Sequence, residues 1–273
     1  MVTVKGDSGG RRFQPSKLQE DKPMQNEHKD IIGLFQSFHS GYRLSEVFGD
    51  FIEVATIALI NRFTFDGDWE QREERYHEIR KKYTEAEFGK MPEILAKLVE
   101  KFIKAGQSGT YEDILGEIYM LLDLGSQSKN QYFTPFYICR MMAQIVGEGL
   151  ADKLEGNPFV SIMEPSCGSG ANIIAFAETI RLKGFDHLQK MAAVAIDIDI
   201  CCARMCFIQC ELLGIPAKII HGNALTGELW TAFRTSHWLY GDFEQMMRAD
   251  IKRQETDPSP SSPMPLEEQL VLF

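Results

Sequence analysis

Residues 161–178 read SIMEPSCGSGANIIAFAE, and this stretch decides the fold. A short apolar run ends at an acid, Glu164, and two glycines, Gly168 and Gly170, then lead into an apolar segment with helical periodicity. The pattern predicts a strand, a glycine turn and a helix. Such a turn is typical of a ligand-binding loop, because backbone without side chains lets a ligand approach closely.

The alternation of strand and helix continues toward the C-terminus. This order is typical of a parallel, right-handed βαβ arrangement. We therefore predict an α/β fold with a Rossmann-like but incomplete sheet of three strands, for which residues 230–243 are the candidate fourth. The spacing predicts strands over 159–163, 192–196 and 217–220, and helices over 171–182 and 200–213.

A polar side chain stands at the end of each predicted strand: Glu164, Asp197 and Asn223. Open α/β sheets bind ligands at the carboxyl ends of their strands. The loop lacks the Lys-Ser/Thr ending of a nucleoside-triphosphate cradle and the third glycine of a dinucleotide site, which leaves S-adenosylmethionine as the candidate. Glu164 would balance its ammonium group, Asp197 would accept from its ribose hydroxyls, and Asn223 would read the adenine amino group. The alternative for each residue is purely structural, as a turn or loop position.

Helical periodicity also predicts the elements before the sheet. Thr134 is the predicted N-cap of a helix that has Pro135 at its first position and stops at Gly147, and Asp199 is the predicted N-cap of a later helix. Further helices are predicted over 66–87, 91–106 and 110–125, with two more inside 30–63 that Gly41 separates.

Composition limits the classes of function. The chain has 273 residues, 44% of them hydrophobic, and a formal net charge of −10. That charge argues against a free-standing, high-affinity DNA binder, although a basic partner would change this. No apolar run is long enough for a membrane span, and no metal-ligand pattern occurs among the cysteines. We expect reduced thiols that pack as small hydrophobic groups in a cytoplasmic protein.

Several motifs together resemble the modification subunit of type I restriction systems and related N6-adenine DNA methyltransferases. The resemblance covers residues 110–225 and includes DILGEIYMLLDL, NQYFTPFYICRMMAQIVG, MEPSCGSGANII, AIDID and HGNAL. It implies S-adenosylmethionine as cofactor, with Asp197 on the ribose and Asn223 on the adenine. It also implies that Phe133, Thr134 and Pro135 lie against the methionine part and that the loop comprises Glu164, Pro165, Ser166, Cys167, Gly168, Ser169 and Gly170.

One departure from that family bears on activity. Its members carry an Asn/Asp-Pro-Pro-Phe/Tyr tetrapeptide that binds the flipped adenine, and no such tetrapeptide occurs in this chain. Trp238 or Tyr240 are candidates for stacking and His237 for a base, so the catalytic residues are unknown. Three functions stay open. The first is an adenine methyltransferase of bacterial or mobile-element DNA, active alone or completed by a second subunit that adds strands. The second is a cofactor-binding relic used for interaction or regulation, and the third is a structural protein with an empty pocket.

The last residues suggest a partner. Gln269, Leu270, Val271, Leu272 and Phe273 are similar to the peptide by which bacterial replication and repair proteins bind the replicative sliding clamp. Leu270, Leu272 and Phe273 would fill an apolar cleft, with Gln269 at its rim. Such a tether would bring an acidic protein to DNA. The predicted division of the chain is a polar tail over 1–28, a helical domain over 29–106, a methyltransferase-like domain over 107–248 and a flexible tail over 249–273.

Overall fold

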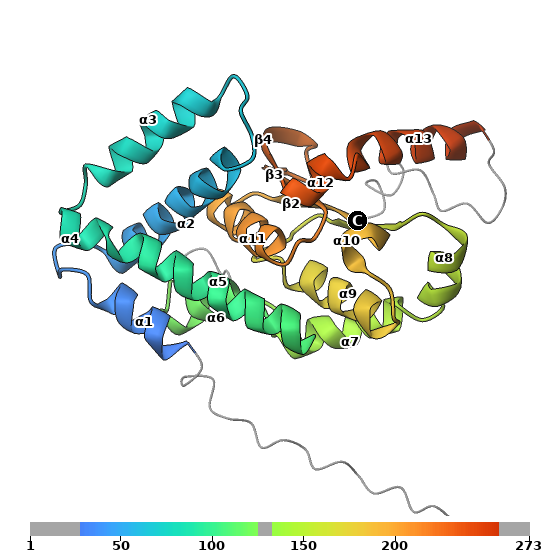
Figure 1. Ribbon diagram of the computed structural model, residues 1–273, viewed down its shortest axis with the longest axis horizontal. Helices are drawn as coiled ribbons and strands as arrows, with labels where there is room; N and C mark the ends of the chain where they lie inside the picture. Colours follow the sequence, from blue (N-terminus) through green and yellow to red (C-terminus); the bar gives the residue numbers. More distant parts are fainter. Residues whose placement is uncertain (1–27, 125–132, 257–273) are drawn as a thin grey trace, which may run out of the picture.

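The computed structural model describes residues 28–124 and 133–256, and the side chains of these residues up to 249 (Figure 1). Almost all of the predicted N-terminal tail, the clamp-binding peptide at residues 269–273 and Tyr132 lie outside the described residues. The domain division therefore stays a prediction. Its last boundary differs from the structure, because the final described helix continues to Thr256, past the predicted start of the tail.

Helices make up the first part of the chain. The two helices expected on either side of Gly41 are present. The helix predicted over 66–87 is divided in two, because the side chain of Thr84 accepts a hydrogen bond from Glu87 N and starts a new helix. The elements are α1 (Lys29–Gln36), α2 (Leu44–Asn61), α3 (Trp69–Arg80), α4 (Glu85–Phe88), α5 (Lys90–Ser108), α6 (Ile114–Leu121), α7 (Phe136–Val146) and α8 (Leu150–Gly156).

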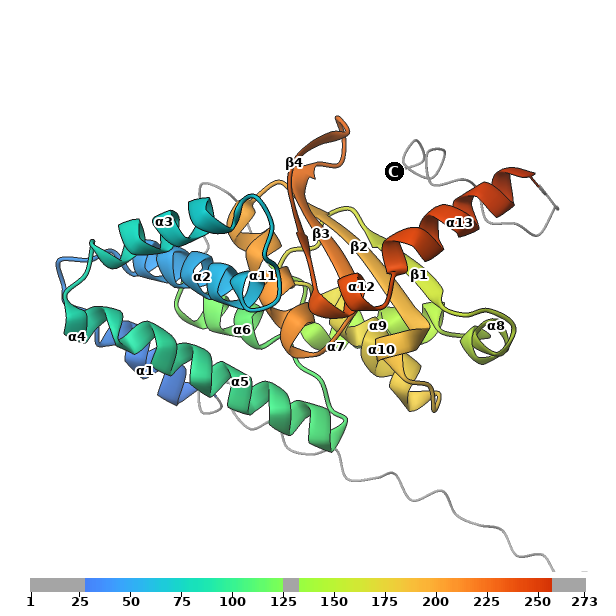
Figure 2. The same ribbon diagram turned by 45° about the horizontal axis from the view of Figure 1, so that its top comes forward.

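Four strands of the described residues form one sheet in the order β1-β2-β3-β4. The first three are parallel, as predicted, and β4 runs antiparallel to β3 as the second arm of a hairpin. Figure 2 shows that this hairpin extends beyond the other strands. The strands are β1 (Val160–Glu164), β2 (Met191–Asp197), β3 (Ala217–Asn223) and β4 (Glu228–Arg234); the helices around them are α9 (Ala171–Leu182), α10 (His187–Lys190), α11 (Ile200–Leu212), α12 (Ser236–Tyr240) and α13 (Phe243–Thr256).

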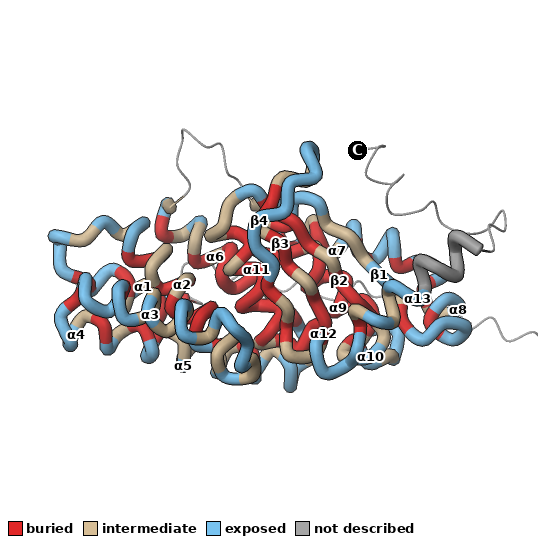
Figure 3. The backbone as a smooth tube through the Cα atoms, turned by 90° about the horizontal axis from the view of Figure 1, so that it is seen from above, coloured by how far each residue is buried: buried red, intermediate tan, exposed pale blue. Residues whose placement is uncertain are grey.

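The two faces of the sheet bury different side chains. Met191 and Ala193 of β2 belong to a large core that α9 and α11 share with the N-terminal helices. Ala192 packs on the opposite face, in a small cluster with Trp238 and Phe243. This alternation is the period of two that a β-strand imposes on its side chains. Buried residues concentrate along the central strands and the helices against them, whereas α4 and α8 at the two ends are more exposed (Figure 3).

α11 links the helical part to the sheet. It packs against α2 on one side and against β3 on the other (Figure 1). Four of the six cysteines lie on it: Cys202, Cys206 and Cys210 are buried, and Cys201 is half-buried. This agrees with the expectation that they pack as small hydrophobic side chains.

Candidate functional site

A cavity of about 320 Å³ lies at the carboxyl ends of β1 and β2. Its volume is at the lower end of the range of small-molecule sites, about 300–1,000 Å³. Residues from three separate parts of the chain form its wall: the stretch before α7, the glycine loop after β1, and the end of β2 with the start of α11. The lining residues are Phe133, Thr134, Cys139, Ser166, Cys167, Gly168, Ser169, Ala171, Asn172, Asp197, Ile198 and Cys202.

The glycine loop needs two backbone conformations that other residues rarely adopt. Gly168 has φ of 53° and Gly170 has φ of 101°, both in the left-handed region. A Cβ at Gly168 would lie 3.2 Å from the ring of Phe133, and a Cβ at Gly170 would lie 3.0 Å from Cys206 Sγ. Both positions therefore require glycine on two independent grounds.

Asp197 connects the end of β2 to this loop. Its Oδ2 accepts a hydrogen bond from Gly168 N at 2.8 Å, and its Oδ1 accepts one from Asp199 N at 2.8 Å. Burial raises the pKa of the Asp197 carboxyl above its usual range, and these two backbone donors oppose the shift. Each carboxylate oxygen keeps a second lone pair for a ligand hydroxyl. Asp199 caps α11, as predicted, by accepting from Cys201 N.

Glu164 ends β1 next to the cavity but does not line it. Its Oε1 accepts from Ser166 N at 3.2 Å, and its Oε2 accepts from the side-chain amide of Asn172 at 2.9 Å. Asn172, on the first turn of α9, does line the cavity. The Glu164 carboxylate therefore orients the side chain of Asn172, which lines the cavity. The negative charge of Glu164 lies next to Asn172, on the side away from the cavity.

The predicted stretch before α7 forms the opposite wall. Phe133 packs its ring on Tyr119, with centroids 5.2 Å apart, and faces Gly168. The predicted N-cap was wrong by one residue: Pro135 is itself the N-cap, and the helix starts at Phe136. Thr134 precedes the cap and lines the cavity. The predicted end at Gly147 is confirmed.

Some predicted site residues lie elsewhere. Asn223 ends β3, but its Oδ1 accepts from Leu225 N at 3.0 Å and Thr226 N at 3.4 Å, so the side chain caps its own turn. The residues of the predicted set outside the cavity wall are Pro135, Glu164, Pro165, Gly170 and Asn223.

The two candidates for stacking on a base, Trp238 and Tyr240, both lie outside the cavity wall. Trp238 is buried in the small core cluster, and its indole Nε1 donates to Glu244, so it was a wrong candidate for stacking on a base. Tyr240 is exposed, and its hydroxyl donates to Phe63 O at 3.5 Å, away from the cavity.

Five lining residues were not singled out from the sequence: Cys139, Ala171, Asn172, Ile198 and Cys202. Ile198 directly follows Asp197 and is 62% exposed, although it is a large apolar residue. Its position directly after a strand-end acid was the available signal, because ligands bind at the carboxyl ends of the strands in open α/β sheets. Cys139 and Cys202 lie inside helices, where nothing local distinguishes them from core residues.

The charge of the cavity selects among ligands. Asp197 lines the wall and Glu164 lies behind it, while no Lys, Arg or His occurs among the described residues that line the cavity. Such a wall repels phosphate groups and attracts a cation. The described residues contain no cluster suited to a metal ion, and none of the described helices has the length and apolarity to span a membrane.

Comparison with known proteins assigns this part of the chain. A model of the N-6 DNA methylase family matches residues 110–247, which are 138 of the 273 residues and include the whole cavity wall. The comparisons with curated proteins and with solved structures gave no significant match.

Proposed function

The chain belongs to the N-6 DNA methylase family, and on that premise we propose that it binds S-adenosylmethionine at the carboxyl ends of β1 and β2. S-adenosylmethionine, when bound, supplies the methyl group for the N6 of adenine in DNA. The sheet is then the cofactor-binding half of a Rossmann-like methyltransferase domain. The resemblance over residues 110–225 and the family match over residues 110–247 support the same conclusion.

One observation carries the proposal. Asp197 accepts a hydrogen bond from Gly168 N and lines the cavity, where its carboxylate oxygens keep lone pairs for a ligand. The cavity wall is acidic and repels phosphate groups. A sulfonium ion and an ammonium group suit that charge, and ribose hydroxyls suit the carboxylate. Gly168 and Ser169 present backbone at the wall, and Ile198 offers an apolar surface on which an adenine ring can pack.

The test is calorimetric titration with S-adenosylmethionine. We expect Asp197→Ala to weaken binding by a factor of at least about ten, since a hydrogen bond to a charged group is worth about 1.5–3 kcal/mol and 1.4 kcal/mol corresponds to tenfold. Glu211→Gln is the matched control, because Glu211 is also a buried carboxylate and its partners are Ser236 and Arg62, outside the cavity wall. Equal affinity of wild type and Asp197→Ala, or no binding by wild type, contradicts the proposal.

We further propose that a second polypeptide supplies the target-base half of the domain. Among the described residues β1 pairs with β2 alone, so its other edge is open. Next to α9, α7 exposes a stripe of apolar side chains that no described strand covers: Tyr137, Met141, Met142, Ile145 and Val146. Added strands beside β1 would bury both features.

Transfer of a radioactive methyl group from S-adenosylmethionine to DNA distinguishes a methyltransferase from a cofactor-binding relic. Labelling by the chain alone favours a complete methyltransferase, and labelling only after a partner is added favours a split enzyme. Cofactor binding without labelling under either condition favours the alternative, a catalytically inactive module for interaction or regulation.

The sliding clamp is the proposed route to DNA. A formal charge of −10 opposes direct attraction to phosphates, and a tethered clamp would raise the local concentration of DNA. We expect immobilised clamp to capture the full chain, and removal of residues 269–273 should abolish this capture. Unchanged capture after the deletion would contradict this route.

A further inference from the structure

A buried carboxylate from outside the cavity holds the glycine loop. Asp113 is the N-cap of α6 and is 3% exposed. Its Oδ2 accepts a hydrogen bond from Ser169 Oγ at 2.5 Å, and its Oδ1 accepts from Gln209 Nε2 at 2.7 Å and from Gly116 N at 3.1 Å. Ser169 is 56 residues away in the chain and belongs to the cavity wall.

Gln209 completes this contact from α11. Its Nε2 also donates to the backbone oxygen of Ser169 at 2.8 Å, and its Oε1 accepts from Leu115 N at 3.0 Å. Ser169 is thus held through its side chain and its backbone. The space is filled, because a Cβ at Gly116 would overlap the Asp113 carboxylate and lie 2.6 Å from Ser169 Oγ.

α6 contacts the cavity wall at two points, one at each end of the helix. Asp113, at its N-terminus, holds Ser169, and Tyr119 packs on Phe133, which in turn faces Gly168. The segment before α6 is itself fixed, since Tyr111 N donates to the buried Glu178 and Tyr111 O accepts from Arg140. The position of α6 is therefore set independently of any ligand.

We propose that Asp113 is a positioning residue that, through Ser169, keeps the backbone of the cofactor loop open for its ligand. The identity of that ligand as S-adenosylmethionine rests on the proposed function; the hold on the loop does not. The two oxygens of the Asp113 carboxyl make all three of these hydrogen bonds at once. Burial raises the pKa of Asp113, while Gln209, Ser169 and Gly116 lower it.

Asp113→Asn is the informative substitution because it keeps the shape and changes one bond. The amide oxygen still accepts from Gln209 and Gly116, but the amide nitrogen now faces Ser169 Oγ and donates where it previously accepted. We expect the dissociation constant for S-adenosylmethionine to rise about tenfold, which corresponds to about 1.4 kcal/mol. Ser169→Ala removes the same bond from the other side.

The double-substitution cycle separates positioning from general destabilisation. If Asp113 acts through Ser169, then Asp113→Asn should change affinity by less than about twofold in a Ser169→Ala background. Full additivity of the two effects would overturn the proposal. Glu211→Gln, a buried carboxylate with neutral partners and an exposed arginine, is the control and should leave affinity unchanged.

A second readout needs no ligand. Amide hydrogen exchange of residues 166–170 in the ligand-free protein should accelerate in Asp113→Asn and in Ser169→Ala but not in Glu211→Gln. Unchanged exchange in the first two variants overturns the proposal even if wild type binds the cofactor. If wild type does not bind S-adenosylmethionine but the exchange pattern is as expected, the proposed function fails and the positioning role stands. If Asp113→Asn does not fold, the exchange measurement on Ser169→Ala alone tests the proposal.

Discussion

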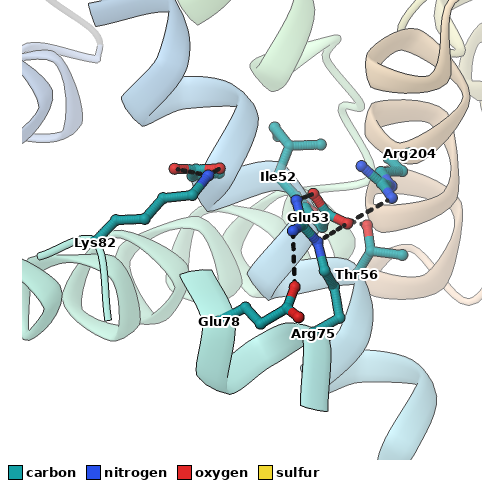
Figure 4. Close-up of polar contacts among 8 residues, drawn as sticks. Ile52, Glu53, Thr56, Arg75, Glu78, Lys82 and Arg204 are labelled. Atoms are coloured by element: carbon teal, nitrogen blue, oxygen red, sulfur yellow. Dashed lines mark hydrogen bonds and ion pairs between the residues drawn. The ribbon is translucent and has the colours of Figure 1, made fainter. Parts of the chain in front are cut away.

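Asp113 and Glu53 are two carboxylates whose surroundings differ in kind: Asp113 is buried, and Glu53 is half-buried. Asp113, beside the cofactor loop, is held by neutral donors: a serine hydroxyl, a glutamine amide and a backbone N–H. Glu53 of α2, at the junction with α3 and α11, is held by two arginines. Arg75 bonds both of its oxygens at 3.1 Å, and Arg204 bonds one at 3.0 Å (Figure 4).

The two arrangements serve different purposes. Neutral donors act along fixed directions at short range, so they determine the position of Ser169 within a fraction of an ångström. Arginines balance the charge of the carboxylate, and the guanidinium fork of Arg75 fixes its orientation with two hydrogen bonds, which suits a contact between helices. The junction has the larger cavity, about 890 Å³ against 320 Å³. Because its charged groups largely pair with one another, it is a weaker candidate for a ligand site.

The pKa values show the same contrast. Burial raises the pKa of both carboxyls. At Glu53 the hydrogen bonds and charges of Arg75 and Arg204 outweigh burial, and the net shift is downward. At Asp113 the neutral donors do not outweigh it, and the pKa stays above its usual range. Burial of the Asp113 carboxyl thus opposes its ionisation, and the neutral donors offset this only in part.

The largest effect should come from filling the space around Asp113. Gly116→Ala places a Cβ against the carboxylate and Ser169, and the network cannot move without breaking several bonds. We expect a loss of about 3 kcal/mol in the free energy of unfolding, measured by urea denaturation. Gly49→Ala is the control: its Cβ would meet nothing within 4 Å inside α2, and it should stabilise by about 0.5–1 kcal/mol. A similar result for both variants would contradict the comparison.

The fold was predictable where the signal is local. Strand–helix alternation gave the three parallel strands, and the helix predicted over 171–182 matches α9. A fourth strand was expected within 230–243, and β4 lies over Glu228–Arg234, but its antiparallel direction was not predicted, because its exposed residues carry no clear alternation and only Phe233 is buried. α6 is shorter than the predicted helix because Asp113 caps it internally. At α6, a single capping residue outweighed the apolar period.

The same limit applies to the site. Gly168 and Asp197 were accessible to sequence reasoning because a turn glycine and a strand-end acid are recognised from their immediate neighbours. The contact of Asp113 with Gln209 joins residues 96 positions apart, and no periodicity or spacing connects them. Asn223 shows the converse: a strand-end amide was expected to face a ligand, but its own turn offered two nearer donors.

A smaller effect is expected at the arginine junction. Glu53→Gln removes the charge that Arg75 and Arg204 share, and Arg75 keeps Glu78 as a partner. We expect a loss of about 1.5 kcal/mol in the free energy of unfolding. Raising the salt concentration should reduce this loss, whereas the loss in Gly116→Ala should not respond to salt. Glu78→Gln, at a more exposed pair, should cost less than about 0.5 kcal/mol. Equal salt dependence at both sites would remove the distinction between charged and neutral donors.

The smallest effect is in the pH dependence of stability: the contributions of the two carboxylates to the free energy of unfolding should change in opposite directions as the pH rises. A lowered pKa means that Glu53 contributes stability above its unfolded value of 4.5, and this contribution is lost as pH falls below it. A raised pKa means that Asp113 contributes most below its unfolded value of 3.8, and that contribution is lost as pH rises through the folded value. Relative to wild type, Glu53→Gln should therefore recover stability toward low pH, and Asp113→Asn should recover it toward neutral pH. The free energies of unfolding of wild type, Glu53→Gln and Asp113→Asn between about pH 3.5 and about pH 7 measure both trends. Trends of the same sign would show that the donors around Asp113 act on its carboxyl as the arginines act on Glu53.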